Sequence, residues 1–199
     1  TFQAGNGVMV APGQYTVTMS QRVDGITKAL GEEETIEVAS IRPEPVLPGS
    51  SQAERVIYDQ QVDELLRVAD GTDYAMGILM EELAAAKAAL KRSTAASALY
   101  QQAVALADRV AVQSERLSGN ETREFYHDWE EMSVAARLWH ARFAPGTNAY
   151  GPTPAQRESF RIARKQYDEV VAALDAIKTD FDALKGAMDA AGAPWSPGR

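Results

Sequence analysis

The chain has 199 residues, 45% of them hydrophobic and 24% charged, which is the composition of an ordinary globular protein. Its formal net charge of −8 argues against a nucleic-acid partner or docking on anionic lipid, because both depend on clustered Lys and Arg. It has no cysteine, which excludes disulfides and zinc–thiolate sites, and no run of about 18 apolar residues, so no membrane insertion is expected.

Residues 1–42 have the pattern of a small antiparallel β element. Apolar and polar side chains alternate over 15–22, which is the period of a half-buried strand. Asp24 and Gly25 form a hairpin turn signal, and a second strand is expected over 26–30. A last strand follows a polar connection.

These strands are too few to close a sandwich, and a sheet this small needs a partner for its apolar face. We therefore predict a partial Ig-like sandwich whose Tyr15, Val17 and Met19 face a cover. That cover is either a set of missing strands or the helices that follow. The start in mid-strand at Thr1 suggests a piece of a longer protein. Three prolines and a glycine over 43–50 predict a stiff linker.

The remainder predicts a helical bundle over 51–192 and a short tail over 193–199. Apolar residues recur there at spacings of three, four and seven, as in amphipathic helices. Short connections favour an up-and-down antiparallel four-helix bundle, so the fold class is mostly α. The expected helices span 51–91, 94–117, 121–143 and 153–191.

Two helix starts carry strong local signals. Ser51 with Glu54 fits a capping box, and so does Thr153 with Gln156, where a proline occupies the first helical position. Gly192 is a plausible stop for the last helix.

The first helix has one irregular place. Gly71 could break or kink it, and Asp73 replaces an apolar residue in the stripe. We interpret Asp73 as a cap for a restarted helix.

The third helix carries a stripe of large side chains with steps of three and four. Core packing is the interpretation we favour for this stripe, because such spacing is typical of an amphipathic helix. Its members are Phe125, Trp129, Met132, Ala136, Trp139 and Phe143.

The stretch 124–131, "EFYHDWEE", is the richest in polar and aromatic groups. His127 and Glu131 have the spacing of a two-point metal clamp, but a third ligand would have to come from another helix. A sugar site would need two facing carboxyls, and on one helix Asp128 and Glu130 project to different faces. A solvated polar face and a core position for Trp129 are therefore the preferred interpretations.

No motif in the sequence indicates a reaction. The chain contains no GxSxG, phosphate-binding loop, GxGxxG or HExxH motif. The apolar stripes contain almost no inward His or Glu that could hold a cofactor. We therefore expect no catalytic residue, no cofactor and no metal site beyond the weak candidates His127 and Glu131.

Several short motifs together resemble a known family. "APGQYTVTMSQRVDG" resembles strands near the C-terminus of BNR/Asp-box-repeat β-propeller proteins, the sialidase-like or sortilin-like proteins that are grouped with glycosyl hydrolases. "SSQAERVIYDQQVDELLRVADG" and "YGPTPAQRESFRIARKQYDEVVAALDAI" are similar to that family's first and last helices, and "MDAAGAPW" is similar to its close. The Asp-box motif itself is absent, and the strand-to-helix junction matches loosely.

The resemblance implies a non-catalytic C-terminal interaction or stabilising module of a larger protein. Its partners would be upstream propeller and sandwich domains, and a secreted, periplasmic or cell-surface location would follow. The alternative is a self-standing helical adaptor or dimerisation domain that self-associates through the stripe of its last helix.

Overall fold

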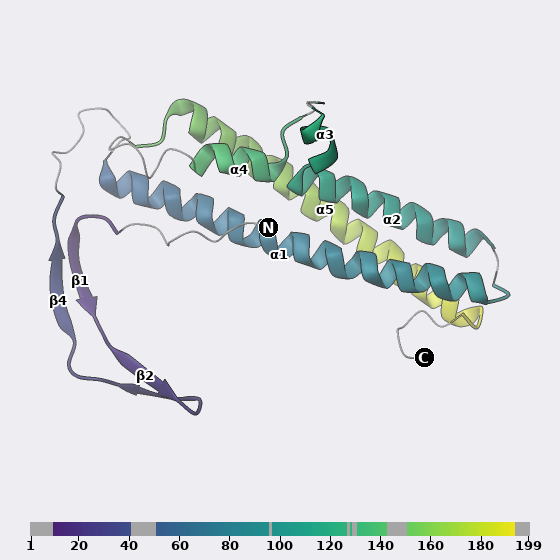
Figure 1. Cartoon of the computed structure of the whole chain (residues 1–199), viewed down its shortest axis with the longest axis horizontal. Helices are drawn as coiled ribbons and strands as arrows, with labels where there is room; N and C mark the ends of the chain where they lie inside the picture. The colour runs from purple at the N-terminus through teal and green to yellow at the C-terminus, as the bar shows by residue number, and fades with distance from the viewer. Residues whose placement is uncertain are drawn as a thin grey trace.

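The computed structural model describes residues 10–40, 51–95, 97–126, 128, 131–142 and 151–193 (Figure 1). The expected linker over 43–50 therefore lies outside the described residues. The helices are α1 (Gln52–Arg92), α2 (Ser97–Ser118), α3 (Glu121–Phe125), α4 (Val134–Arg142) and α5 (Pro154–Ala190). The strands are β1 (Gly13–Val17), β2 (Ser20–Val23), β3 (Ile26–Ala29) and β4 (Glu34–Val38).

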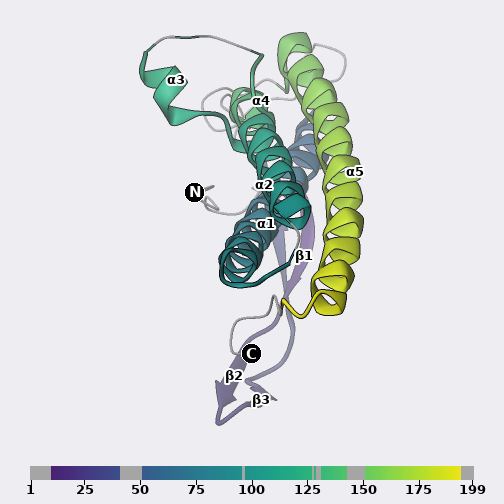
Figure 2. The same ribbon diagram turned by 90° about the vertical axis from the view of Figure 1, so that its right-hand side faces the viewer.

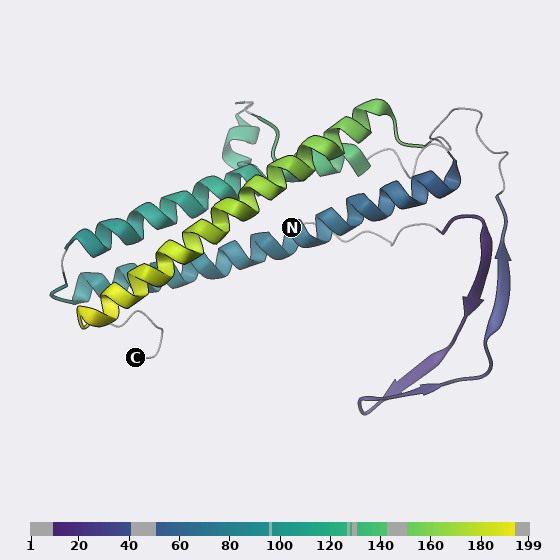
Figure 3. The same ribbon diagram turned by 180° about the vertical axis from the view of Figure 1, so that it is seen from behind.

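Helices α1 and α5 are the two long rods of the bundle, and α2 and α4 pack against both of them end to end (Figures 1 and 3). Contacts with α5 show the direction of this third row. Arg109 of α2 pairs with Asp180 at 2.6 Å, whereas Ser159, nearer the start of α5, donates to the carbonyl of Arg137 in α4 at 2.9 Å. Residue numbers therefore increase along α2 and α4 in the direction in which they decrease along α5. Both helices thus run antiparallel to α5.

This arrangement confirms the predicted mostly helical antiparallel bundle with a small antiparallel β element. The bundle differs in one respect from the predicted four full-length helices. Helices α2 and α4 run in the same direction and lie end to end, so together they form one row of the bundle. Seen nearly end-on, α3 stands away from these packed helices (Figure 2). The main core is continuous along the rods. Its largest fully buried side chains include Leu65, Met76, Leu83, Leu117, Leu138, Ile177, Phe181 and Met188.

Local capping explains where the long helices begin and end. Ser51 and Glu54 form the expected capping box at α1, and Thr153 with Gln156 forms the expected one at α5. At the end of α5, the N–H of Ala193 donates to the carbonyl of Met188, and Gly192 has a φ of 71°. This is a Schellman motif, in which glycine adopts the left-handed conformation at low cost.

Helix α1 passes through Gly71 without interruption, so no break occurs there. The interpretation of Asp73 as a cap for a restarted helix is therefore wrong. Its Oδ1 instead accepts a 2.8 Å hydrogen bond from the hydroxyl of Ser118, the last residue of α2. The residue that interrupts the α1 stripe thus ties two helices together.

The prediction of one continuous helix over 121–143 is also wrong. Helix α3 ends at Phe125, and the next helical residue in the described part of the chain is Val134. The hydroxyl of Ser133 accepts from the N–H of Ala136, which is the hydrogen bond of an N-cap and fixes a new helix start.

This break changes which residues face the core. Phe125 and Trp139 are 78% and 68% exposed, and Met132 is also exposed, although all three belong to the predicted stripe. The side chains that α4 buries are Val134, Leu138 and Ala141. Helical spacing alone could not distinguish the two sets, because tertiary packing decides which face of a short helix is covered.

The strands form an arm of two successive antiparallel ribbons (Figures 1 and 3). In the first ribbon β1 pairs with β4, and in the second β2 pairs with β3 around the turn at Asp24 and Gly25. The N–H of Leu30 donates to the carbonyl of Met19 at 2.8 Å and joins the two ribbons at their bend.

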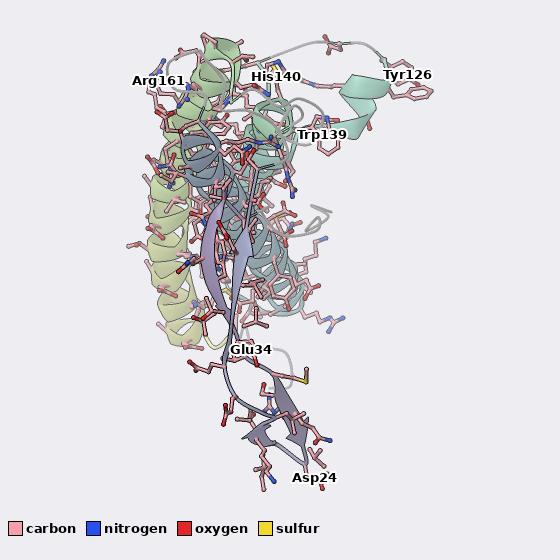
Figure 4. All side chains as sticks on the ribbon, turned by 90° about the vertical axis from the view of Figure 1, so that its left-hand side faces the viewer. Asp24, Glu34, Tyr126, Trp139, His140 and Arg161 are labelled. Atoms are coloured by element: carbon pink, nitrogen blue, oxygen red, sulfur yellow. The ribbon has the colours of Figure 1, made fainter. Side chains whose placement is uncertain are left out.

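The helices do not cover this arm. Among the described residues, no strand packs against a helix, and the strands extend away from the bundle (Figure 4). Val17 and Met19 are 47% and 66% exposed, and Tyr15 is only partly buried. Of the two covers that the sequence left open, the helices of this chain are therefore the wrong one among the described residues, and missing strands stay a prediction.

Candidate functional site

One of the two candidate metal ligands lies within the described residues. His127 lies outside the described residues. Glu131 is exposed, accepts a 2.7 Å hydrogen bond from Nε2 of Gln166 and lies 3.9 Å from the guanidinium of Arg137. Its carboxylate therefore links α4 to α5. No group of three His, Cys, Asp or Glu side chains among the described residues could hold a metal ion.

The aromatic segment around α3 points outward. The Phe125 and Tyr126 rings meet edge to face, with centroids 5.2 Å apart, and both are largely exposed. Trp139 and His140 on α4 are exposed as well, and Figure 4 places Tyr126 and Trp139 on the same side of the molecule. Asp128 is exposed, whereas Trp129 and Glu130 lie outside the described residues.

A buried phenol hydroxyl lies near the start of α1. Tyr58 is 4% exposed, and its hydroxyl contacts the carbonyl oxygens of Gln156 at 3.0 Å and of Ala141 at 3.4 Å. Its ring packs edge to face on Phe160, with centroids 5.7 Å apart. Burial raises the pKa of Tyr58 to about 12, which Arg157 partly offsets. The phenol is thus neutral near pH 7 and joins three helices.

Charged groups surround this tyrosine. Asp59 lies 3.6 Å from Nε of Arg55, and Asp63 lies 3.4 Å from Nε of Arg142 across the interface between α1 and α4. Burial raises the pKa of the Asp59 carboxyl, Arg55 and Arg142 lower it, and Asp63 adds to the rise. One Asp59 oxygen, Oδ1, is buried and has no hydrogen-bond partner among the described residues. These charged groups lie around the junction at which Tyr58 joins α1, α4 and α5.

The arm presents an apolar face that the helices leave exposed. Alternate residues of each strand share a face, so Tyr15 and Val17 of β1 lie on the same face as Ile36 and Val38 of β4. Tyr15 pairs directly with Ile36, and its hydroxyl donates to the carbonyl of Ala11 at 2.7 Å, which fixes the ring.

The opposite face of this ribbon is polar. Gln14 pairs with Glu37, and Thr16 pairs with Thr35. The ribbon is thus amphipathic, although its own helices leave the apolar side uncovered. At the tip, Val23 and Ile26 pair beside the turn and are exposed too.

Comparison of the chain with family models, curated proteins and solved structures finds no match. Within the described part of the chain, none of the helices has the length and apolar character that crossing a bilayer requires.

Sequence reasoning missed two of these features for different reasons. The Tyr58 junction had a weak signal, since Tyr58 stands four residues before Val62 of the α1 stripe. The exposure of Phe125 follows from the helix break before α4. The sequence signal for that break was Ser133, because serine is favoured at the start of a helix. The strand alternation did reveal the arm, but it could not reveal that the arm stands apart.

Proposed function

We propose that this chain is a non-catalytic interaction or stabilising module, and that the arm is the part that docks onto its neighbour. In the arrangement that the sequence resemblance implies, the neighbour is an upstream sandwich or propeller domain of the same protein. One observation carries the proposal: the apolar face of the arm, with Tyr15, Val17 and Ile36, is not covered by the helices.

Physical chemistry supports a docking role for such an arm. A two-stranded ribbon is at best marginally stable in water, because it cannot bury enough apolar surface to offset its conformational entropy. A third strand or a cover over Val17 and Ile36 would remove that surface from water and add main-chain hydrogen bonds. The bundle would then act as a rigid base.

The alternative, dimerisation through the stripe of the last helix, has less support. The stripe residues Val170, Leu174, Ile177 and Phe181 are buried within the bundle, in the same core as α1 and α2. A second copy could reach them only if the bundle opened.

The test compares this chain alone with the same chain joined to the upstream region that the resemblance implies. Hydrogen exchange of the β1 and β4 amides should slow by about tenfold or more in the longer protein, because a docked ribbon no longer opens freely. Amides of α5 around Ile177 serve as the control and should exchange equally in both. Equal exchange of the arm amides in both proteins would contradict the proposal.

A second measurement addresses catalysis. The purified chain should hydrolyse none of a panel of glycosides. Hydrolysis that a single carboxylate substitution in this chain abolishes, for example at Asp128 or Glu131, would overturn the non-catalytic assignment.

A further inference from the structure

The charge of the arm is not evenly shared between its strands. Over residues 10–40 there are five carboxylates and two cationic side chains. The cations, Arg22 and Lys28, both belong to the ribbon at the tip. The carboxylates gather on β4 and the connection before it, with one at the tip turn. They are Asp24, Glu32, Glu33, Glu34 and Glu37.

The outer edge of β4 is open to another strand. Within the described residues β4 pairs with β1 alone, so one row of its backbone N–H and C=O groups has no strand beside it. Such an edge is a template for strand addition, in which main-chain bonds give affinity and side-chain pairs give specificity.

We propose that the outer edge of β4 receives a basic strand of a partner polypeptide in antiparallel pairing. This inference rests on the proposed docking role of the arm and names the chemistry of the partner. A second copy of this chain is disfavoured as the occupant, because the arm carries −3 and the remaining residues carry −5 of the total of −8.

The register of β4 defines what the partner strand must contain. Glu34, Ile36 and Val38 share the apolar face, and Thr35 and Glu37 share the polar one. Directly opposed side chains in antiparallel strands lie about 5 Å apart, where opposite charges attract and like charges repel. A strand running from opposite Val38 to opposite Glu34 should therefore read apolar, basic, apolar, Thr, basic.

Two synthetic peptides test this pattern. One carries the core Val-Lys-Val-Thr-Lys, and the matched control carries Val-Glu-Val-Thr-Glu. Binding is followed by backbone amide shifts of the ¹⁵N-labelled chain. The basic peptide should shift the Thr35 and Glu37 amides and bind at least about tenfold more tightly than the acidic one, since two attractive pairs replace two repulsive ones.

A charge-reversal variant separates pairing from general attraction to an acidic protein. The double variant Glu34→Lys with Glu37→Lys should reverse the preference and bind the acidic peptide more tightly. The matched control Glu81→Lys with Glu82→Lys changes the charge equally on α1 and should keep the original preference. Both variants should retain the dispersed amide spectrum of the bundle.

Three results would overturn the inference: equal binding of both peptides, shifts confined to helix amides, or an unchanged preference in the Glu34/Glu37 variant. These results leave the docking role itself open to its own test. If the arm amides become protected beside the upstream region while no basic peptide binds, the arm docks through its apolar face and the basic-strand inference alone fails.

Discussion

The hydroxyl of Tyr58, near the start of α1, donates a 3.0 Å hydrogen bond to the main-chain carbonyl of Gln156 in the first turn of α5. The same oxygen lies 3.4 Å from the carbonyl of Ala141 in the last turn of α4. One side chain thus joins the ends of three helices. Removing the hydroxyl by Tyr58→Phe should lower the free energy of unfolding by about 1 kcal/mol, because a buried carbonyl loses its donor.

Urea denaturation of the intact chain measures this difference. Tyr74→Phe provides the matched control, since Tyr74 lies on the same helix and is 74% exposed. It should leave the midpoint unchanged. Equal effects of the two substitutions would show that the Tyr58 hydroxyl does not join the helices.

Tyr58 also gives the bundle a pH dependence in alkali. Burial raises its pKa to about 12 from the ordinary 10.0. Because the folded state holds this proton more tightly, the stabilisation is fully present below pH 10 and is lost as the pH rises through about 12. The free energy of unfolding should fall over this window, and Tyr58→Phe should flatten the fall. An equally steep fall in Tyr58→Phe would assign it to other groups.

Asp59 has the opposite effect on the free energy of unfolding at neutral pH, where it should destabilise the folded chain. Burial raises the pKa of its carboxyl above 3.8, so the folded state disfavours the ionised form. Its contribution to stability is greatest below pH 3.8 and is lost as the pH rises through the folded pKa. Asp59→Asn should therefore stabilise the chain at pH 7, by about 0.5–1 kcal/mol. The gain should vanish in acid.

Asp63→Asn is the matched control for that prediction. Asp63 faces Arg142 across two helices, so this substitution removes an ion pair and should cost up to about 1 kcal/mol. Thermal unfolding at pH 7 and at pH 3.5 compares the three proteins. Destabilisation by Asp59→Asn at pH 7 would mean that the Arg55 contact outweighs burial.

The sequence predicted the features that local interactions determine. Helix α5 is the clearest case, because Thr153, Gln156 and Gly192 mark its ends and its heptads mark its buried face. The position of Phe125 and the isolation of the arm depend on which surfaces meet in three dimensions. Alternation over 15–22 shows that a strand has an apolar face, but nothing local specifies what covers that face.

Truncation of a side chain near α4 should affect stability according to whether that side chain is buried or exposed. Leu138 is fully buried, so Leu138→Ala should cost about 2–5 kcal/mol by leaving a cavity. Phe125 is 78% exposed, so Phe125→Ala should change stability by no more than about 0.5 kcal/mol. Urea denaturation of both variants checks this. A large loss of stability in Phe125→Ala would mean that the aromatic stripe does belong to the core.

Substitution by alanine should change stability in opposite directions at two glycines, Gly71 and Gly192. Gly71 lies inside α1, and a Cβ placed there meets no atom within 4 Å, so Gly71→Ala should stabilise the chain by about 0.5–1 kcal/mol. Gly192 has a φ of 71° in the Schellman motif, where alanine is strained, and Gly192→Ala should destabilise it by about 1 kcal/mol. Thermal unfolding of the two variants separates them, because a break in α1 at Gly71 would make both substitutions destabilising.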